Sequence, residues 1–270
     1  MNRIWAVAAI TFKEGIRNRA LYGIGLLALL MCGANLIISG MMMREVGKVA
    51  VDVGLASVGF AGLLLLLFVT INQLASDLDH KTLYMILARP VSRTGYLLGK
   101  YLGMVLLIAA TMLLLALAMG VTLFLIEMGA QDYFERINWG LICLALLFNT
   151  LQLLLLCAIS FFFASFTSTS FLTLILTIVT YAIGHGLPAV KKILQSADQI
   201  GIQVSELTVK LVEGAAWIFP NLALFDIRTQ AAHGLLLGWQ YIAGTLIYFI
   251  VYTAMVLLAA IIIFRRREFP

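Results

Sequence analysis

The chain has 270 residues, of which 63% are hydrophobic and 11% are charged. A soluble domain carries about 25% charged residues, so this composition excludes an ordinary soluble globule and predicts an all-α polytopic membrane protein in a single domain, residues 1–270. The net charge is +5, and because the positive charges stand beside apolar runs, they indicate orientation in a membrane and not a nucleic-acid partner.

The first element in the chain is a basic, partly apolar segment at residues 2–19. Its charged side chains are Arg3, Lys13, Glu14, Arg17 and Arg19, and the elbow-helix residues among them are Lys13, Glu14, Arg17 and Arg19. The segment is too short and too charged to span a bilayer, so we predict an elbow helix that lies in the membrane interface. A basic terminus without such a helix is the alternative.

Six apolar runs follow, and each is long enough to cross a membrane, which takes about 20 residues. We predict spans at about 20–42, 53–75, 101–126, 138–163, 170–188 and 238–264. An even number of spans places both termini on one side. That side carries 11 basic and 4 acidic residues, against 7 and 9 on the other side. The excess of basic residues predicts that both termini are cytoplasmic.

The predicted spans contain few strongly polar side chains. We find no buried acid for a proton relay and no set of groups for a membrane enzyme or a metal site. Asn149 and Gln152, one turn apart, are expected either to bond across helices or to line a substrate path. His185, near the end of a span, is interpreted as an interfacial histidine. The three cysteines are expected to be small core residues: Cys32, Cys143 and Cys157.

The loop between the second and third spans, residues 76–100, holds the densest cluster of charge. It contains an apolar stripe at helical spacing that includes Leu83 and Leu87, and Pro90 ends that stretch. Ser92 is placed to cap a second helix start. A short amphipathic helix of this kind suits docking into a groove on a cytoplasmic partner, and lying flat on the lipid surface is the alternative.

Three glycines with a spacing of four residues, Gly95, Gly99 and Gly103, stand where this loop meets the third span. Such a stripe of small residues allows close helix approach. We predict tight packing where force enters the membrane, with a chance pattern in a glycine-rich chain as the alternative.

The stretch from residue 189 to 237 is the longest connection and is expected to be external. Its apolar residues recur at alternating spacings of three and four: Val190, Ile193, Ala197, Ile200, Val204, Leu207 and Leu211. This seam predicts an external amphipathic helix of about 25 residues. The helix is expected to pack across a permease dimer, to bind an external partner or to lie on the membrane.

The motif DLDHKTLYMILARPVSRTGYLLGK, residues 77–100, resembles the pattern of ABC-2-type transporter permeases. The segments FKEGIRNRALY at 12–22 and FPNLALFDIR at 219–228 resemble the elbow helix and the segment before the last span in the same family. The chain looks most like the compact six-span permeases of the NosY-like and gliding-motility type.

This resemblance implies that residues 76–100 are a coupling helix for an ATPase subunit. The implied coupling residues are Asp77, Asp79, His80, Lys81, Thr82, Leu83, Leu87, Arg89, Pro90, Arg93 and Lys100. The implied external motif comprises Pro220, Asn221, Phe225 and Asp226.

The resemblance also implies a non-enzymatic export permease in a bacterial or archaeal cytoplasmic membrane. It would pair with a second copy of itself or a related permease and with two ABC ATPase subunits, which hold ATP and Mg. The chain itself lacks the pattern G-x-x-x-x-G-K-[ST] of a nucleotide-binding P-loop. The alternatives are an ATP-independent channel or carrier, and an ABC-type mechanical transmitter that acts on an external partner.

Overall fold

The computed structural model describes residues 3–42, 45–70, 92–129, 138–167, 169–199 and 205–266. Across these ranges every regular element is helical, and six helices are long and apolar enough to cross a membrane. They are α2 (Arg19–Met41), α3 (Val46–Leu65, continued by η1, Leu66–Thr70), α6 (Arg93–Gly129), α7 (Trp139–Phe166), α8 (Ser170–Gln199) and α11 (Trp239–Arg266). The prediction of an all-α polytopic membrane protein is confirmed.

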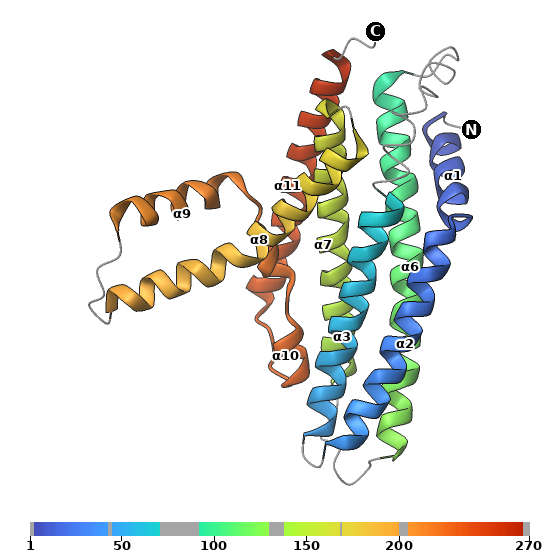
Figure 1. Cartoon of the computed structure of the whole chain (residues 1–270), viewed down its shortest axis with the longest axis vertical. Helices are drawn as coiled ribbons and strands as arrows, with labels where there is room; N and C mark the ends of the chain where they lie inside the picture. The colour runs from blue at the N-terminus through green and yellow to red at the C-terminus, as the bar shows by residue number, and fades with distance from the viewer. Residues whose placement is uncertain are drawn as a thin grey trace.

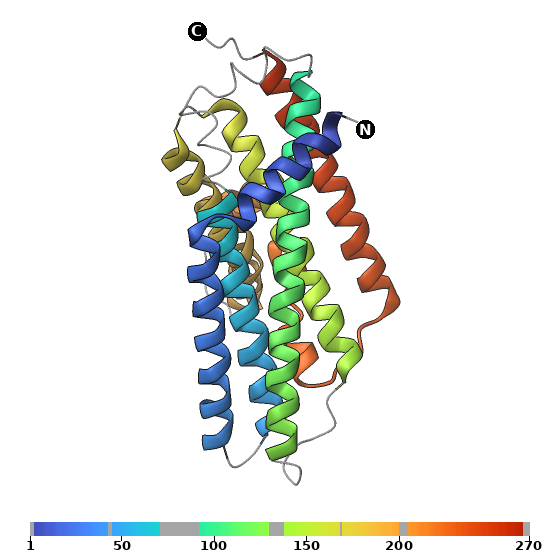
Figure 2. The ribbon, with the colours of Figure 1, turned by 90° about the vertical axis from the view of Figure 1, so that its right-hand side faces the viewer.

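α2, α3, α6, α7 and α11 stand side by side in an elongated bundle, which α1 (Arg3–Ile16) crosses near one end, whereas α8 runs obliquely out of the bundle (Figure 1, Figure 2). α1 and the C-terminal end of α11 lie at the same end of the bundle (Figure 1). The centre consists of α3 and α7, whose most apolar windows are 50% and 56% buried. The corresponding figures for α2 and α11 are 11% and 17%, so these helices present most of their surface to the surroundings.

Polar side chains fix the starts of two spans. Asn18 accepts a hydrogen bond from the backbone of Ala20 at 3.0 Å, and Asn138 accepts one from Leu141 at 3.3 Å. Each bond satisfies a backbone N–H that has no partner within its own helix. The two caps therefore set where α2 and α7 begin.

The third span begins earlier than its hydropathy predicts. Its predicted start was about residue 101, whereas α6 starts at Arg93 and includes the last part of the predicted loop. The Oγ of Ser92 accepts a hydrogen bond from the backbone N–H of Gly95 at 3.1 Å, which confirms the predicted cap. The second span also begins earlier, at Val46, beside an ion pair in which the Nζ of Lys48 donates to Glu45 at 2.8 Å.

The prediction of one external helix through the apolar seam is wrong. Val190 and Ile193 belong to α8, which continues from the fifth span without a break to Gln199, whereas Leu207 and Leu211 lie on α9 (Glu206–Ile218). α8 and α9 extend sideways from the bundle and contact each other as a hairpin (Figure 1). Ala197 is within α8, and Ile200 and Val204 lie outside the described residues.

The physical reason is that apolar periodicity does not register a chain reversal. Gly201 and Ser205 are the residue types that stop and restart helices, and they stand between the two halves of the seam. After α9 the chain bends by 61° into the segment Leu222–Ala232, which contains η3 (Leu222–Phe225) and α10 (Arg228–Ala232). η3 packs against α7 and α8, and α10 packs against α3 and α7. The bend therefore brings residues 222–232 back to the bundle.

Candidate functional site: a polar cavity within the bundle

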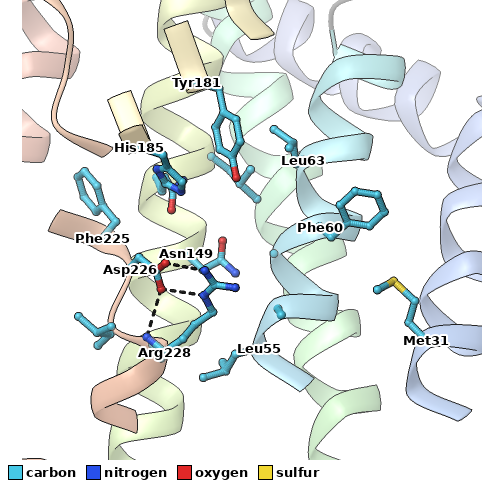
Figure 3. Close-up of a pocket in the computed structure, with 16 residues that line it drawn as sticks. Met31, Leu55, Phe60, Leu63, Asn149, Tyr181, His185, Phe225, Asp226 and Arg228 are labelled. Carbon is cyan, nitrogen blue, oxygen red and sulfur yellow. Dashed lines mark hydrogen bonds and ion pairs between the residues drawn. The ribbon is translucent and has the colours of Figure 1, made fainter. Parts of the chain in front are cut away.

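A cavity of about 340 Å³ lies between the spans and the returning segment (Figure 3). Its walls come from α2, α3, α7 and α8 together with residues 225–228. One side is polar and contains Asn149, Gln152, Tyr181, His185, Asp226 and Arg228. The opposite side is apolar and contains Met31, Leu55, Phe60 and Leu63. The volume is within the usual range of small-molecule sites, about 300–1,000 Å³.

An ion pair dominates the polar side. Arg228 donates to Asp226 through Nε to Oδ1 at 2.8 Å and through Nη2 to Oδ2 at 2.6 Å, a bidentate arrangement. Burial disfavours the charged carboxylate, but the hydrogen bonds and the charge of Arg228 outweigh this effect and hold the pKa of Asp226 below its usual value. Both side chains stay partly exposed, at 42% for Arg228 and 29% for Asp226, so the pair borders the open space.

A second polar contact joins two spans above the ion pair. The amide nitrogen of Gln152 on α7 lies 3.2 Å from Nε2 of His185 on α8. With the Gln152 amide in this orientation its nitrogen donates and Nε2 of His185 accepts, whereas the buried Nδ1 has no hydrogen-bond partner within the described residues. The ring of Tyr181 lies 4.6 Å from the ring of His185, measured between centroids. His185 is therefore a cavity residue, and its position at the membrane interface stays a prediction.

Asn149 and Gln152 were expected either to bond across helices or to line a path. Gln152 bonds across helices to His185 and also borders the cavity, while a substrate path at this place stays a prediction. Asn149 lines the cavity opposite Gly59, where an added Cβ would come within 2.9 Å of the Asn149 amide nitrogen. The absence of a side chain at Gly59 thus leaves room for that amide between α3 and α7.

Close backbone packing holds the returning segment in place. A Cβ at Gly184 of α8 would lie 2.7 Å from the carbonyl oxygen of Pro220, so only glycine fits this crossing. The backbone N–H of Asn221 donates to the Tyr248 hydroxyl at 2.8 Å, and the Tyr241 hydroxyl donates to the carbonyl of Leu224 at 2.6 Å. These contacts with α8 and α11 position the residues that follow, including the ion pair.

A second close contact lies at the end of the bundle that carries α1. A Cβ at Gly99 would be 2.8 Å from the carbonyl oxygen of Ile4, and one at Gly103 would be 2.6 Å from that of Ala8. The glycines let α1 and α6 touch backbone to backbone, while Gly95 is buried one turn earlier. Arg93 donates to the carbonyl of Arg265 at 3.3 Å, which adds α11 to this junction.

Residues 5–269 match the profile of the ABC-2 family transporter proteins. The chain belongs to the ABC-2 transporter family. No curated protein matches the chain. An ABC-2 permease is the membrane component of a transporter and is not itself catalytic, which agrees with the six spanning helices.

In this permease the predicted coupling residues fall into two groups. Those from Asp77 to Pro90 lie outside the described residues: Asp77, Asp79, His80, Lys81, Thr82, Leu83, Leu87, Arg89 and Pro90. Arg93 and Lys100 lie on α6. Lys100 is only 2% exposed, and its Nζ stands 5.9 Å from the centre of the Tyr96 ring. Glu14 of α1 acts electrostatically on Lys100.

The other predicted residues occupy three regions. Lys13 and Glu14 lie on α1, and Arg19 begins α2. Pro220 and Asn221 contact α8 and α11, whereas Phe225 and Asp226 reach the cavity. Sequence reasoning missed Tyr181 and Arg228. The motif FPNLALFDIR contains both Asp226 and Arg228. An acidic and a basic residue two positions apart were therefore the available signal for an ion pair.

Within the described ranges, no three histidine, cysteine or acidic side chains come together in a way that would hold a metal ion. Of the cysteines, Cys157 is buried, Cys32 is intermediate and Cys143 is exposed, and all three are free. The cavity instead offers hydrogen-bonding groups and one compensated ion pair beside an apolar wall. Such a lining suits binding, because it provides orientation on one side and apolar contact on the other.

Proposed function

We propose that this ABC-2 permease exports a substrate across a cytoplasmic membrane, driven by a separate ATPase subunit that docks on residues 76–100. A second permease, either a copy of this chain or a related one, and a second ATPase subunit complete the complex. Both termini then face the cytoplasm. The export direction and the subunit composition rest on the resemblance to compact six-span permeases.

The observation that carries this proposal is the close junction of α6 with α1 at the end of residues 76–100. α6 is one helix of 37 residues that begins at Arg93. A movement of residues 76–92 therefore acts on the start of a long rigid element. Because Gly99 and Gly103 bring α6 into backbone contact with α1, the two helices are expected to move together.

The energy source also supports a partner. The chain carries no P-loop sequence, so nucleotide binding through that motif must occur in another subunit. ATP and Mg would bind in the ATPase, and closure of its two copies would move the docking segments. The permease contributes the membrane path and the mechanical connection.

The test is purification of the tagged chain from its native membrane in mild detergent, followed by identification of its partners and an ATPase assay. We expect an approximately equimolar P-loop ATPase that is lost in the double variant Arg89→Glu/Arg93→Glu. The matched control is Lys191→Glu/Lys192→Glu on α8, which reverses the same number of charges and should retain the ATPase. Size-exclusion profiles establish that both variants are folded.

A stable oligomer without any ATPase would contradict the proposal. The alternative of an ATP-independent channel or carrier would then predict flux in liposomes that contain this chain alone. Loss of the ATPase in both double variants would show that overall charge, and not residues 76–100, determines the association.

A second candidate function, mechanical transmission to an external partner, is favoured by the α8–α9 hairpin. Large apolar side chains on this hairpin are strongly exposed: Ile193, Leu207, Leu211, Trp217 and Ile218. In that case the ATPase would move the hairpin and its partner, and little would pass through the permease. ATP-driven flux in liposomes that contain only permease and ATPase would exclude this candidate.

A further inference from the structure

We propose that the cavity between α3, α7, α8 and the returning segment binds a net-neutral amphiphile. The polar head would contact Arg228, Asn149 and Tyr181, and the tail would lie along Phe60 and Leu63. This inference rests on the proposed transport function, because it names the substrate class of the permease.

The first argument is the hydrogen-bonding capacity that remains on the polar side. Asp226 engages Nε and Nη2 of Arg228, and no bond within the described residues uses Nη1. The Asn149 amide likewise has no hydrogen-bond partner within that part of the chain, although it borders the cavity. The close-up shows the side chains of Arg228, Asn149 and Tyr181 around the same space (Figure 3). A ligand head with donors and acceptors would satisfy these groups.

The second argument is the charge balance of the cavity. Asp226 compensates the charge of Arg228 through a bidentate pair, and a neutral His185 adds none. The lining is therefore neutral as a whole. A ligand with a net charge would leave water for a site inside the spans that offers no unpaired counter-charge, which is unfavourable. A neutral head keeps the hydrogen bonds without this cost.

The third argument is the apolar wall and its position. Phe60 lines the cavity and is also 48% exposed, which places the mouth beside α3. Met31 of α2 stands on the same side. Both residues lie near the middle of spanning helices, so an amphiphile can reach the mouth from within the bilayer. A ligand tail along this wall would shield both itself and the apolar side chains from water, which favours binding.

The experiment measures binding of three short amphiphiles that share an octyl-length chain and differ in head charge. They are 1-octanoylglycerol, octanoate and octylammonium, each radiolabelled, with equilibrium dialysis against the full chain in nanodiscs. Empty nanodiscs correct for partition into lipid. We expect saturable binding of 1-octanoylglycerol that is at least about tenfold tighter than that of either ion.

Charge variants test whether the ion pair sets this preference. Asp226→Asn removes the carboxylate bonded to Arg228 and leaves only the electrostatic influence of exposed Asp52 on α3, so it should shift the preference to octanoate. Arg228→Gln leaves Asp226 uncompensated and should shift it to octylammonium. The double variant Asp226→Asn/Arg228→Gln should again prefer the neutral ligand, even if either single variant is too unstable to measure. Glu213→Gln, on exposed α9, is the matched control and should behave like the wild type.

The inference is overturned if the wild type binds none of the three ligands beyond the empty nanodiscs, or if it prefers an ion. It is also overturned if the double variant loses the neutral preference. The assay needs neither ATP nor the ATPase. A negative result therefore removes the substrate class without affecting the proposed role of residues 76–100, which co-purification tests separately.

Discussion

Gly99 of α6 lies so close to Ile4 of α1 that a Cβ at Gly99 would stand 2.8 Å from the Ile4 carbonyl oxygen. Replacing Gly99 with leucine must push the two helices apart, because the obstructing atom belongs to the backbone. Overpacking of this kind costs about 1–3 kcal/mol. We expect Gly99→Leu to lower the apparent melting temperature in detergent and to reduce the coupling of transport to ATP hydrolysis in proteoliposomes.

Gly120 supplies the matched control on the same helix, since a Cβ there meets nothing within 4 Å. Gly120→Leu should leave both the melting temperature and the coupling ratio close to the wild type. Equal coupling in Gly99→Leu and Gly120→Leu would show that the α1–α6 junction does not transmit force.

Lys100 supports a second prediction, because a cation that is 2% exposed depends on its surroundings. Glu14 acts on it electrostatically but is itself exposed, so Glu14→Gln should cost only about 1 kcal/mol of stability. Lys100→Met keeps an unbranched chain and removes the buried charge. In this variant the effect of Glu14→Gln should vanish, which thermal unfolding of the two single variants and the double variant measures. Additive losses would contradict the coupling between the two side chains.

The spanning helices could be predicted because hydropathy alone determines them. The first span was expected at about 20–42 and is formed by α2 at Arg19–Met41. The third span extends further than predicted because its first turns, with Gly95, Gly99 and Lys100, are buried within the protein, and Gly99 lies directly against α1. Hydropathy does not distinguish a polar residue in a loop from one that a neighbouring helix covers.

The cavity was only partly predictable. Asn149 and Gln152 were visible as amides in an apolar span, since polar side chains are unfavourable there. The ion pair beside them was not visible, because Asp226 and Arg228 reach the cavity through a bend that the sequence does not encode as a span. His185 illustrates the same limit, since its contact with Gln152 joins residues 33 positions apart.

The two amides should respond differently to replacement by leucine. Gln152 bonds to His185 across two helices, and such bonds in membranes contribute about 0.6 kcal/mol on average. Gln152→Leu should therefore lower the melting temperature slightly. Asn149→Leu removes no hydrogen bond within the described residues and should leave the melting temperature unchanged while it alters transport in proteoliposomes. A lower melting temperature in Asn149→Leu together with altered transport only in Gln152→Leu would show that Asn149 stabilises the fold and that Gln152 contacts the substrate.

The α8–α9 hairpin supports the last prediction, which concerns its side of the membrane. The excess of basic residues on the side of the termini predicts that the hairpin lies outside the cell. Ile193 and Leu211 are 67% and 64% exposed on it. In a variant without native cysteines, Ile193→Cys and Leu211→Cys should react with a membrane-impermeant maleimide in intact cells. Lys13→Cys on α1 is the control and should react only after lysis. Labelling of the hairpin only after lysis would reverse the orientation, and residues 76–100 would then be unable to meet a cytoplasmic ATPase.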